Sequence, residues 1–274
     1  MASLTRTLRS RRINGAASGR IIELENVEKV YSTRQGGQTP ALTAVSLAVN
    51  AGEFVSLVGP SGCGKTTLLK ICAGLLAPTS GAVRFLGTPG PAPPGAYGIV
   101  FQNAALLPWR TVMENLLFPA DILKLDRNQA RERARRLLLL ARLDDVEDKY
   151  PGELSGGMQQ RASLARALLH DPEILFMDEP FGALDALTRE GLNLELQQIH
   201  LDQRKTIAFI THNIQEAVLL SDRIVVMTPR PGKMAAEVSN PMPRPRTLAD
   251  SLKDEFRSIE VKVRSLLEQG GEGG

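Results

Sequence analysis

Gly59-Pro60-Ser61-Gly62-Cys63-Gly64-Lys65-Thr66 is the stretch that decides the fold, and it fits the pattern G-x-x-x-x-G-K-[ST] at every position. A β-rich run over residues 53–58 precedes it, and an apolar run of helical character over residues 66–71 follows it. A phosphate-binding loop requires this order of strand, glycine loop and helix. The stretch therefore predicts a nucleotide site in an α/β fold.

The residue types in this loop suit phosphate binding. We expect the three glycines to adopt backbone angles closed to other residues, so that successive N–H groups point into one concavity. The helix N-terminus adds its dipole, Lys65 supplies a cation for the β- and γ-phosphates, and the Thr66 hydroxyl is placed to ligate Mg²⁺. The alternative is a glycine turn before a buried helix. The residues predicted to bind the nucleotide are Gly59, Ser61, Gly62, Cys63, Gly64, Lys65, Thr66 and Thr67.

Composition narrows the class of protein. The chain has 274 residues, of which 43% are apolar, enough for one large domain with an appendage. A net charge of only +3 argues against a nucleic-acid partner, although residues 1–19 predict a basic, disordered tail. The only cysteines, Cys63 and Cys72, exclude a disulfide framework or zinc site and fit a reducing cytoplasm. No apolar run reaches the length of a membrane span, so any membrane role must come from a partner.

Two aromatic residues and a glutamine are candidate functional residues in loops. Tyr31 follows a predicted strand over residues 21–27 and could stack on an adenine, although exposed aromatics are common in sheets. Gln102 ends a short apolar strand and could reach a metal ion or a water molecule. Trp109, the only tryptophan, lies beside Pro108 outside any periodic pattern. It could belong to a docking surface or cap a local core.

A second glycine-rich stretch, Leu154-Ser155-Gly156-Gly157-Met158-Gln159-Gln160, opens a predicted helix to Leu169. Ser155 is a good N-cap, and a serine with two glycines at a helix start forms a second anion site. The stretch could be a cap alone. Beside a phosphate loop in the same chain, the anion site is favoured.

Two further apolar strands end in polar side chains. Residues 174–177 lead to Asp178, which suits the Mg²⁺ shell, and to Glu179, which can polarise a water beside the γ-phosphate. The simpler interpretation is two acids that start a turn. A strand over residues 206–210 delivers His212 in the same way, whereas His170 and His200 lie at helix ends and are interpreted as structural.

Three helices are also predicted from periodicity. Residues 126–143 place alanine and leucine on one face and arginines on a solvated face, and a helix follows Asp185 to about Leu201. A stripe at the C-terminus predicts an amphipathic helix that packs on the rest of the chain, through Leu248, Leu252, Phe256, Ile259, Val263 and Leu266.

Residues 20–238 together resemble the ATP-binding subunit of ABC transporters. The resemblance rests on a Walker A motif at residues 59–66, a Q-loop at Gln102, a signature at residues 154–160, Walker B at residues 174–179, a D-loop ending at Asp185 and a switch histidine at His212. Tyr31 matches the aromatic that stacks on adenine. The resemblance implies a P-loop NTPase core with an antiparallel β subdomain and a helical subdomain that carries the signature. Residues 239–274 then form a C-terminal helix with a flexible tail.

The family resemblance implies an ATPase that uses ATP and Mg²⁺ and acts as a dimer. Two subunits pair head to tail, so the signature residues Ser155, Gly156, Gly157 and Gln159 of one face the nucleotide of the other. Metal contacts are implied for Thr66, Gln102 and Asp178, and catalytic roles for Glu179, His212, Gln102 and Lys65. One Walker A and one signature occur, so a second copy or a partner chain must supply the other half.

Residues 107–115 and 225–232 look like those of the nitrate, sulfonate and taurine importer group. The resemblance implies a peripheral subunit on the cytoplasmic face of the cell membrane, with Leu107, Pro108 and Trp109 against a permease and a substrate-binding protein involved indirectly. Both stretches are expected to face the permease or the domain surface. The cargo is not encoded in the chain.

Two other classes of function remain open. A soluble ABC-type ATPase acting on ribosomes or DNA would be expected to show two cassettes or a long coiled coil. A P-loop kinase would need an acceptor site and has no use for Ser155, and ATP turnover without a phosphorylated acceptor would exclude it.

Cys63 also carries an expectation about reactivity. It lies between Gly62 and Gly64, where amide donors, Lys65 and the helix dipole favour a thiolate. We expect it to be accessible without nucleotide and Cys72, among apolar neighbours, to be inert.

Overall fold

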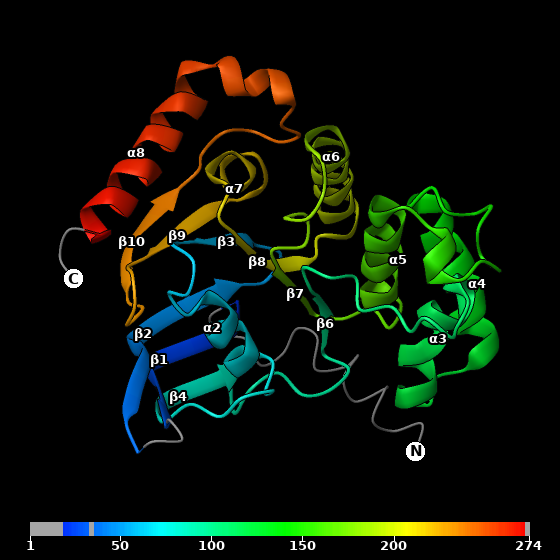
Figure 1. Ribbon diagram of the computed structural model, residues 1–274, viewed down its shortest axis with the longest axis horizontal. Coiled ribbons are helices and arrows are strands. Elements are labelled where there is room, and N and C mark those ends of the chain that lie inside the picture. The colour runs from blue at the N-terminus through cyan, green and yellow to red at the C-terminus, as the bar shows by residue number, and fades with distance from the viewer. Residues whose placement is uncertain (1–18, 33–35, 272–274) are drawn as a thin grey trace.

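The computed structural model describes residues 19–32 and 36–271, and the predicted tail lies outside these residues except for Gly19. Two sheets and a separate group of helices make up the fold (Figure 1). No helix in the described part of the chain is both long enough and apolar enough to cross a membrane.

The first sheet is antiparallel, in the order β2-β1-β4-β5. Its strands are β1 (Arg20–Ser32), β2 (Gln38–Asn50), β4 (Ser80–Phe85) and β5 (Thr88–Pro89). Ile22 pairs with Val49 on one side and with Phe85 on the other, and all three side chains are buried. Strand β1 extends well beyond the predicted residues 21–27, because β2 and β4 pair with it on its two sides and complete its hydrogen bonds.

The second sheet has the order β10-β9-β3-β8-β7-β6 and is parallel except at β10. Its strands are β3 (Phe54–Val58), β6 (Tyr97–Val100), β7 (Ile174–Asp178), β8 (Thr206–Thr211), β9 (Arg223–Met227) and β10 (Met234–Ser239). Every residue of β3 and β8 is buried, as expected for a strand covered on both faces. The parallel strands therefore deliver their C-terminal residues to one edge, where α/β sheets bind ligands.

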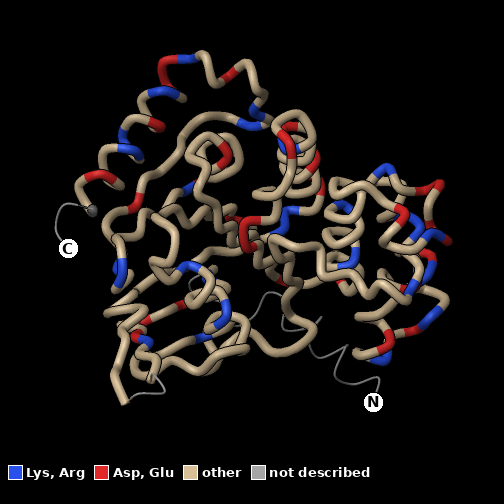
Figure 2. The backbone as a smooth tube through the Cα atoms, in the orientation of Figure 1, with Lys and Arg blue, Asp and Glu red and all other residues tan. Residues whose placement is uncertain are grey.

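Helices cover this sheet and also form a group at one side. Helices α2 (Lys65–Cys72), α6 (Ala186–Gln203), α7 (Ile214–Leu220) and α8 (Asp254–Gly271) surround the sheet, and α3 (Val112–Leu123), α4 (Arg127–Leu140) and α5 (Gly156–Leu168) form the group at its β6 end (Figure 1). Charges of both signs occur along α8 and α4 carries mainly arginines, whereas the strands of the second sheet are mostly uncharged (Figure 2). The expected arrangement of an NTPase core with a β subdomain and a helical subdomain is confirmed.

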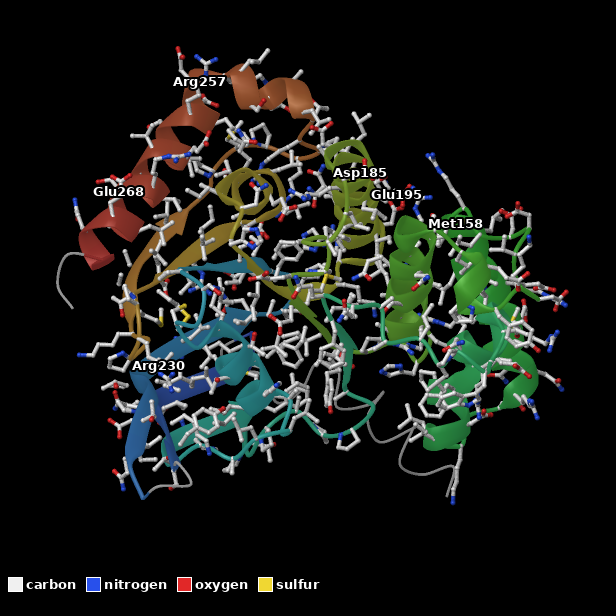
Figure 3. The ribbon with its side chains drawn as sticks, viewed as in Figure 1. Met158, Asp185, Glu195, Arg230, Arg257 and Glu268 are labelled. Carbon is white, nitrogen blue, oxygen red and sulfur yellow. The ribbon has the colours of Figure 1, made fainter. Side chains whose placement is uncertain are left out.

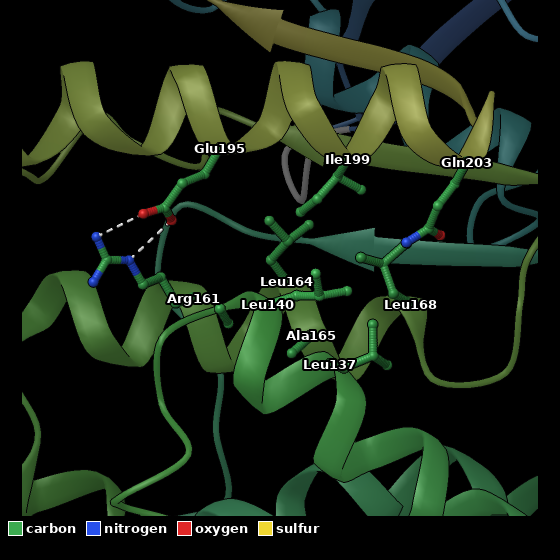
Figure 4. A pocket seen from close by; sticks show the side chains of 10 residues that line it. Leu137, Leu140, Arg161, Leu164, Ala165, Leu168, Glu195, Ile199 and Gln203 are labelled. Atoms are coloured by element: carbon green, nitrogen blue, oxygen red, sulfur yellow. Dashed lines mark hydrogen bonds and ion pairs between the residues drawn. The ribbon is translucent and has the colours of Figure 1, made fainter.

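Helices α3, α4 and α5 form the helical subdomain, and contacts between α5 and α6 join it to the core. Arg161 donates from Nε and Nη2 to the two carboxylate oxygens of Glu195, each at 3.1 Å (Figure 4). Leu164 and Ile199 line the apolar pocket beside this pair. A bidentate arginine–carboxylate pair fixes orientation as well as distance, so it defines how the subdomain meets the core.

Helix α3 was not predicted, although a capping box marks its start. Thr111 Oγ1 accepts from the Glu114 amide at 3.2 Å, and Glu114 Oε2 accepts from the Thr111 amide at 2.9 Å. Pro119 inside this helix and Pro108 before it obscure the helical spacing of the apolar residues, so the sequence did not indicate a helix here. Helix α4 is shorter than the predicted 126–143, because Asp126 is its N-cap and Ala141 its C-cap. Helix α7 and strand β10 were not predicted from the sequence either.

The C-terminal helix packs on the core as predicted, but its stripe begins later. Phe256 and Val263 are fully buried, whereas Leu248 and Leu252 are exposed in a separate 3₁₀ turn (Leu248–Leu252). The segment before it is anchored by Arg246, which is 1% exposed and donates to backbone carbonyls of α7 and its C-cap. Residues beyond 238 thus share the main apolar core.

Candidate nucleotide site

A cavity of about 410 Å³ lies at the C-terminal edge of the second sheet. The residues that line it come from segments far apart in the sequence: Tyr31, Ala41, Ser61, Gly62, Cys63, Gly64, Lys65, Thr66, Thr67, Gln102, Asp178, Glu179 and Arg230. The structure therefore brings most of the predicted site residues together. Ala41 and Arg230 are the two that the sequence did not indicate.

The glycines of the phosphate loop serve two different needs. Gly62 has φ +75° and Gly64 φ +105°, which confirms the predicted left-handed backbone. Gly59 differs, because its φ is not positive and its constraint is space. A Cβ there would lie 2.9 Å from Cys63 Sγ and 3.1 Å from Met227 Cβ. The expectation of a special backbone angle at Gly59 is therefore wrong, and close packing is the reason for the glycine.

Lys65 is folded back on its own loop. Its side chain is buried, and Nζ donates to the carbonyl oxygens of Gly59 at 2.8 Å and Pro60 at 3.0 Å. Helix α2 begins at this residue, with the Leu68 amide donating to Gly64 O at 2.9 Å. The cation and the helix N-terminus thus face the cavity together, where an anion is favoured.

The oxygen ligands at the other end of the loop fit Mg²⁺. Thr66 Oγ1 donates to Asp178 Oδ1 at 3.0 Å, and the Gln102 amide is exposed and lines the same cavity. Burial raises the pKa of Asp178, and the hydrogen bond from Thr66 opposes that rise. The described residues contain no cluster of three or more His, Cys, Asp or Glu side chains. Mg²⁺ needs none, since it commonly uses one carboxylate with waters and substrate phosphates.

Glu179 and His212 meet across neighbouring strands. Glu179 follows β7 with φ +46°, and its amide donates to Ile210 O at 2.9 Å. Its Oε2 lies 3.1 Å from His212 Nδ1, just beyond the end of β8. Gln102 is also near, because a Cβ on Gly182 would lie 3.4 Å from Gln102 Nε2 and 3.7 Å from Glu179 Oε2. A turn does start here, but a turn alone does not account for the separate partners of Asp178 and Glu179.

Tyr31 marks the other end of the cavity. Its hydroxyl lies 3.3 Å from Thr67 Oγ1, and its ring is 38% exposed. A half-exposed ring at the mouth of an anion site suits stacking on a base, so the adenine role stays a prediction.

The signature residues lie elsewhere. Ser155 caps α5, accepting from the Met158 amide at 3.3 Å, and Gln159 Nε2 donates to Pro151 O at 3.0 Å. Asp185 caps α6 through the Thr188 amide, and this hydrogen bond holds the pKa of Asp185 below its usual value. Figure 3 shows Asp185 and Met158 near the outer ends of α6 and α5. Among the described residues that line the cavity, none belongs to the signature.

Comparison with known proteins decides the family. Residues 42–182 match the family model described as ABC transporter. An uncharacterized ABC transporter ATP-binding protein of Methanocaldococcus jannaschii is 44% identical, over 90% of this chain and 91% of its own length. This chain belongs to the ABC transporter ATP-binding family. It is an ABC-type ATPase, as predicted.

Two named relatives and two solved structures agree with this family. A bicarbonate transport ATP-binding protein of Synechocystis is 47% identical over 82% of this chain and 80% of its own, and an aliphatic sulfonates import ATP-binding protein of Bacillus cereus is 41% identical over 91% and 97%. The dimeric structure of a bacterial ABC transporter cassette aligns with a TM-score of 0.72 and 34% identity, over 81% of this chain and all of that one. A post-hydrolysis form of that cassette with ADP and Pi gives the same TM-score at 33% identity.

The Trp109 side chain of the ABC ATPase is 71% exposed, which rules out a role as the cap of a local core. The loop that carries it is nonetheless ordered by the buried Asn115. The Asn115 side chain donates to the carbonyls of Leu107 and Arg110 at 3.1 and 3.0 Å, and its oxygen accepts from the Leu107 amide at 2.7 Å. An exposed tryptophan on a loop with a fixed conformation is available for binding to a partner protein.

Two histidines of the ABC ATPase are structural, as interpreted from the sequence. His170 Nε2 lies 2.9 Å from Tyr97 O, and His200 Nδ1 lies 2.8 Å from Lys205 O. Burial is the main cause that lowers the pKa of each ring.

The expectation that Cys63 is an accessible, reactive thiol is wrong. Its side chain is 1% exposed and belongs to the apolar cluster between the two sheets. The physical reason is packing: the thiol lies among the apolar side chains of this cluster, and Lys65 Nζ lies 3.8 Å from Cys63 Sγ. Cys72 is buried too, and burial raises the pKa of its thiol to about 12.

We therefore expect neither cysteine to react with maleimide in the folded ABC ATPase, with or without MgATP. Because reaction requires local opening, labelling should be at least about a hundredfold slower than in denaturant. Mass spectrometry of both peptides over time checks this. Rapid modification of Cys63 in native protein, suppressed by MgATP, would restore the accessible thiol.

Proposed function

We propose that the ABC ATPase is the energising subunit of a membrane importer and that it works as a homodimer. The observation that supports a dimer is that the cavity and the signature are separate within one chain. The described residues that line the cavity include none of the signature, while Ser155 and Gly156 are exposed at the start of α5. A helix start with exposed amides attracts phosphate. A second copy would place that anion site over the γ-phosphate and complete the cavity.

The residues of the cavity divide the chemistry. Lys65 and the loop amides would hold the phosphates, with Lys65 exchanging its bonds to Gly59 and Pro60 for phosphate oxygens. Thr66, Asp178 and Gln102 would hold Mg²⁺, which supplies charge neutralisation for the phosphate oxygens. Glu179 would take the proton of the attacking water, and His212, released from its contact with Glu179, would face the γ-phosphate.

The proposal extends to partners and cargo. The relatives named for bicarbonate transport and aliphatic sulfonate import support a small anion as cargo, and nitrate and taurine belong to the same chemical range. The subunit would sit peripherally at the cytoplasmic face of the membrane against permease subunits, with a substrate-binding protein on the far side. Leu107, Pro108 and Trp109 are the proposed permease contact.

Replacing Trp109 with alanine tests the permease contact. A tryptophan anchor that fills a partner's pocket is worth about 2 kcal/mol or more, so co-purification with the permease should fall roughly thirtyfold. The thermal unfolding temperature of the isolated subunit should stay unchanged, because the side chain is exposed. Leu252→Ala is the matched control, since Leu252 is 69% exposed in the 3₁₀ turn before α8.

The outcomes separate transport from a soluble role. Loss of permease binding in Trp109→Ala, with Leu252→Ala unaffected, supports the importer. Undiminished ATP-dependent binding of both variants to the permease would contradict the proposed contact. A full-length ATPase that binds no permease at all would favour the soluble alternative.

A further inference from the structure

The loop between β9 and β10 is part of the nucleotide site. It is closed by the Thr228 amide, which donates to Lys233 O at 3.0 Å, and by the Lys233 amide, which donates to Thr228 Oγ1 at 3.0 Å. The resemblance to the importer group leads us to expect this stretch at the permease or at the domain surface. Arg230 is exposed, and it also lines the cavity. Figure 3 shows Arg230 beside β2.

Strand β2 holds this loop against the phosphate loop. The Gly232 amide donates to Ala41 O at 2.9 Å, and the Thr43 amide donates to Gly232 O at 3.0 Å. A Cβ on Gly232 would lie 1.9 Å from Cys63 O, so the loop backbone rests directly on the phosphate loop. The position of Arg230 is therefore fixed by backbone contacts to both β2 and the phosphate loop.

The guanidinium of Arg230 is exposed and only partly engaged. Its Nε donates to Pro40 O at 3.0 Å, and within the described residues neither Nη1 nor Nη2 has a partner and no carboxylate pairs with it. The acids of the cavity are engaged elsewhere, Asp178 with Thr66 and Glu179 with His212. An arginine with two free donors at an anion site is suited to a phosphate.

The position of Arg230 along the cavity indicates which phosphate. Its anchor, Pro40, pairs with Val30, and the neighbouring Thr39 pairs with Tyr31. Arg230 thus lies at the Tyr31 end of the cavity, where the base and the first phosphate would enter. We propose that Arg230 is a further nucleotide-binding residue, which donates to the α-phosphate of ATP or ADP. This inference rests on the assignment of the cavity as the nucleotide site.

Calorimetry with ATP and ADP in EDTA tests the contact. Loss of a charge-assisted hydrogen bond should weaken binding of both nucleotides roughly tenfold in Arg230→Gln, because both carry the α-phosphate. Arg230→Lys keeps the charge and should lose less than about threefold. Lys233→Gln is the matched control: it removes the same charge from the same loop, from an exposed residue that does not line the cavity.

The possible results are distinct. Equal losses for ATP and ADP in Arg230→Gln, with rescue by Lys and no effect in Lys233→Gln, support the proposal. Wild-type affinity in Arg230→Gln, a loss confined to ATP, an equal loss in Lys233→Gln, or no rescue by Lys would each overturn it. Lys65→Ala tests the assignment of the cavity as the nucleotide site. If Lys65→Ala binds ATP normally, that assignment fails. If Lys65→Ala loses ATP binding while Arg230→Gln binds normally, only the inference about Arg230 fails.

Discussion

Glu179→Gln should bind ATP with near-normal affinity and lose most of its hydrolysis. General-base assistance is typically worth about a hundred- to ten-thousand-fold in rate, and glutamine keeps the shape of the side chain without the base. The backbone at Glu179 stays in place, because its amide is held by Ile210 O and its side chain is not part of that bond. Steady-state phosphate release in the presence of the permease, beside calorimetric ATP affinity, measures both quantities.

The control for this variant is an acid outside the cavity and outside the helical subdomain. Glu260→Gln removes the same charge from a partly buried carboxylate, but that carboxylate pairs only with Arg264 on α8, at 3.3 Å, among the described residues. It should leave the chemical step within a few-fold of wild type. Near-normal turnover by Glu179→Gln would contradict the role of Glu179 as the base.

The largest stability loss is expected from Arg246→Ala. The guanidinium donates to five backbone carbonyls, those of Val218, Leu219, Ser221, Asn240 and Met242, at 2.7 to 3.4 Å. Burial, followed in size by the positive charge of Arg244, lowers the pKa of Arg246 to about 10, so Arg246 remains charged at neutral pH. Truncation leaves the carbonyls unpaired in the core and should lower the free energy of unfolding by about 3–5 kcal/mol.

Urea titration followed by circular dichroism measures this change. Arg264→Ala is the matched control, because Arg264 is exposed on α8 with a single 3.3 Å bond to Glu260. An exposed pair of this kind is worth at most about 1 kcal/mol. A change below about 1 kcal/mol in Arg246→Ala would show that water or neighbouring groups satisfy the carbonyls, and that Arg246 does not anchor the C-terminal segment.

Local patterns predicted those parts of the site that are continuous in sequence. The phosphate loop, Ser155 as an N-cap and the buried strands that end at Asp178 and near His212 are each readable from a few neighbouring residues. The parallel sheet then brings the strand ends together without further information.

Features set by packing between distant segments could not be read in this way. Arg230 and Ala41 enter the cavity because β2, the phosphate loop and the β9–β10 loop meet there. The inward direction of the Cys63 side chain and the crowding at Gly59 and Gly232 have the same origin. Helix α3 could have been predicted, since Thr111 and Glu114 match the capping-box pattern.

The central claim, that two chains complete one another's ATP site, is tested most directly by the mass of Glu179→Gln in solution. Light scattering during size-exclusion chromatography should give the 29.8 kDa of a single chain without nucleotide and twice that mass with MgATP. Adding Ser155→Arg, which blocks the exposed start of α5, should abolish the MgATP-dependent dimer. A single-chain mass at saturating MgATP, or a dimer that Ser155→Arg leaves intact, would contradict the account.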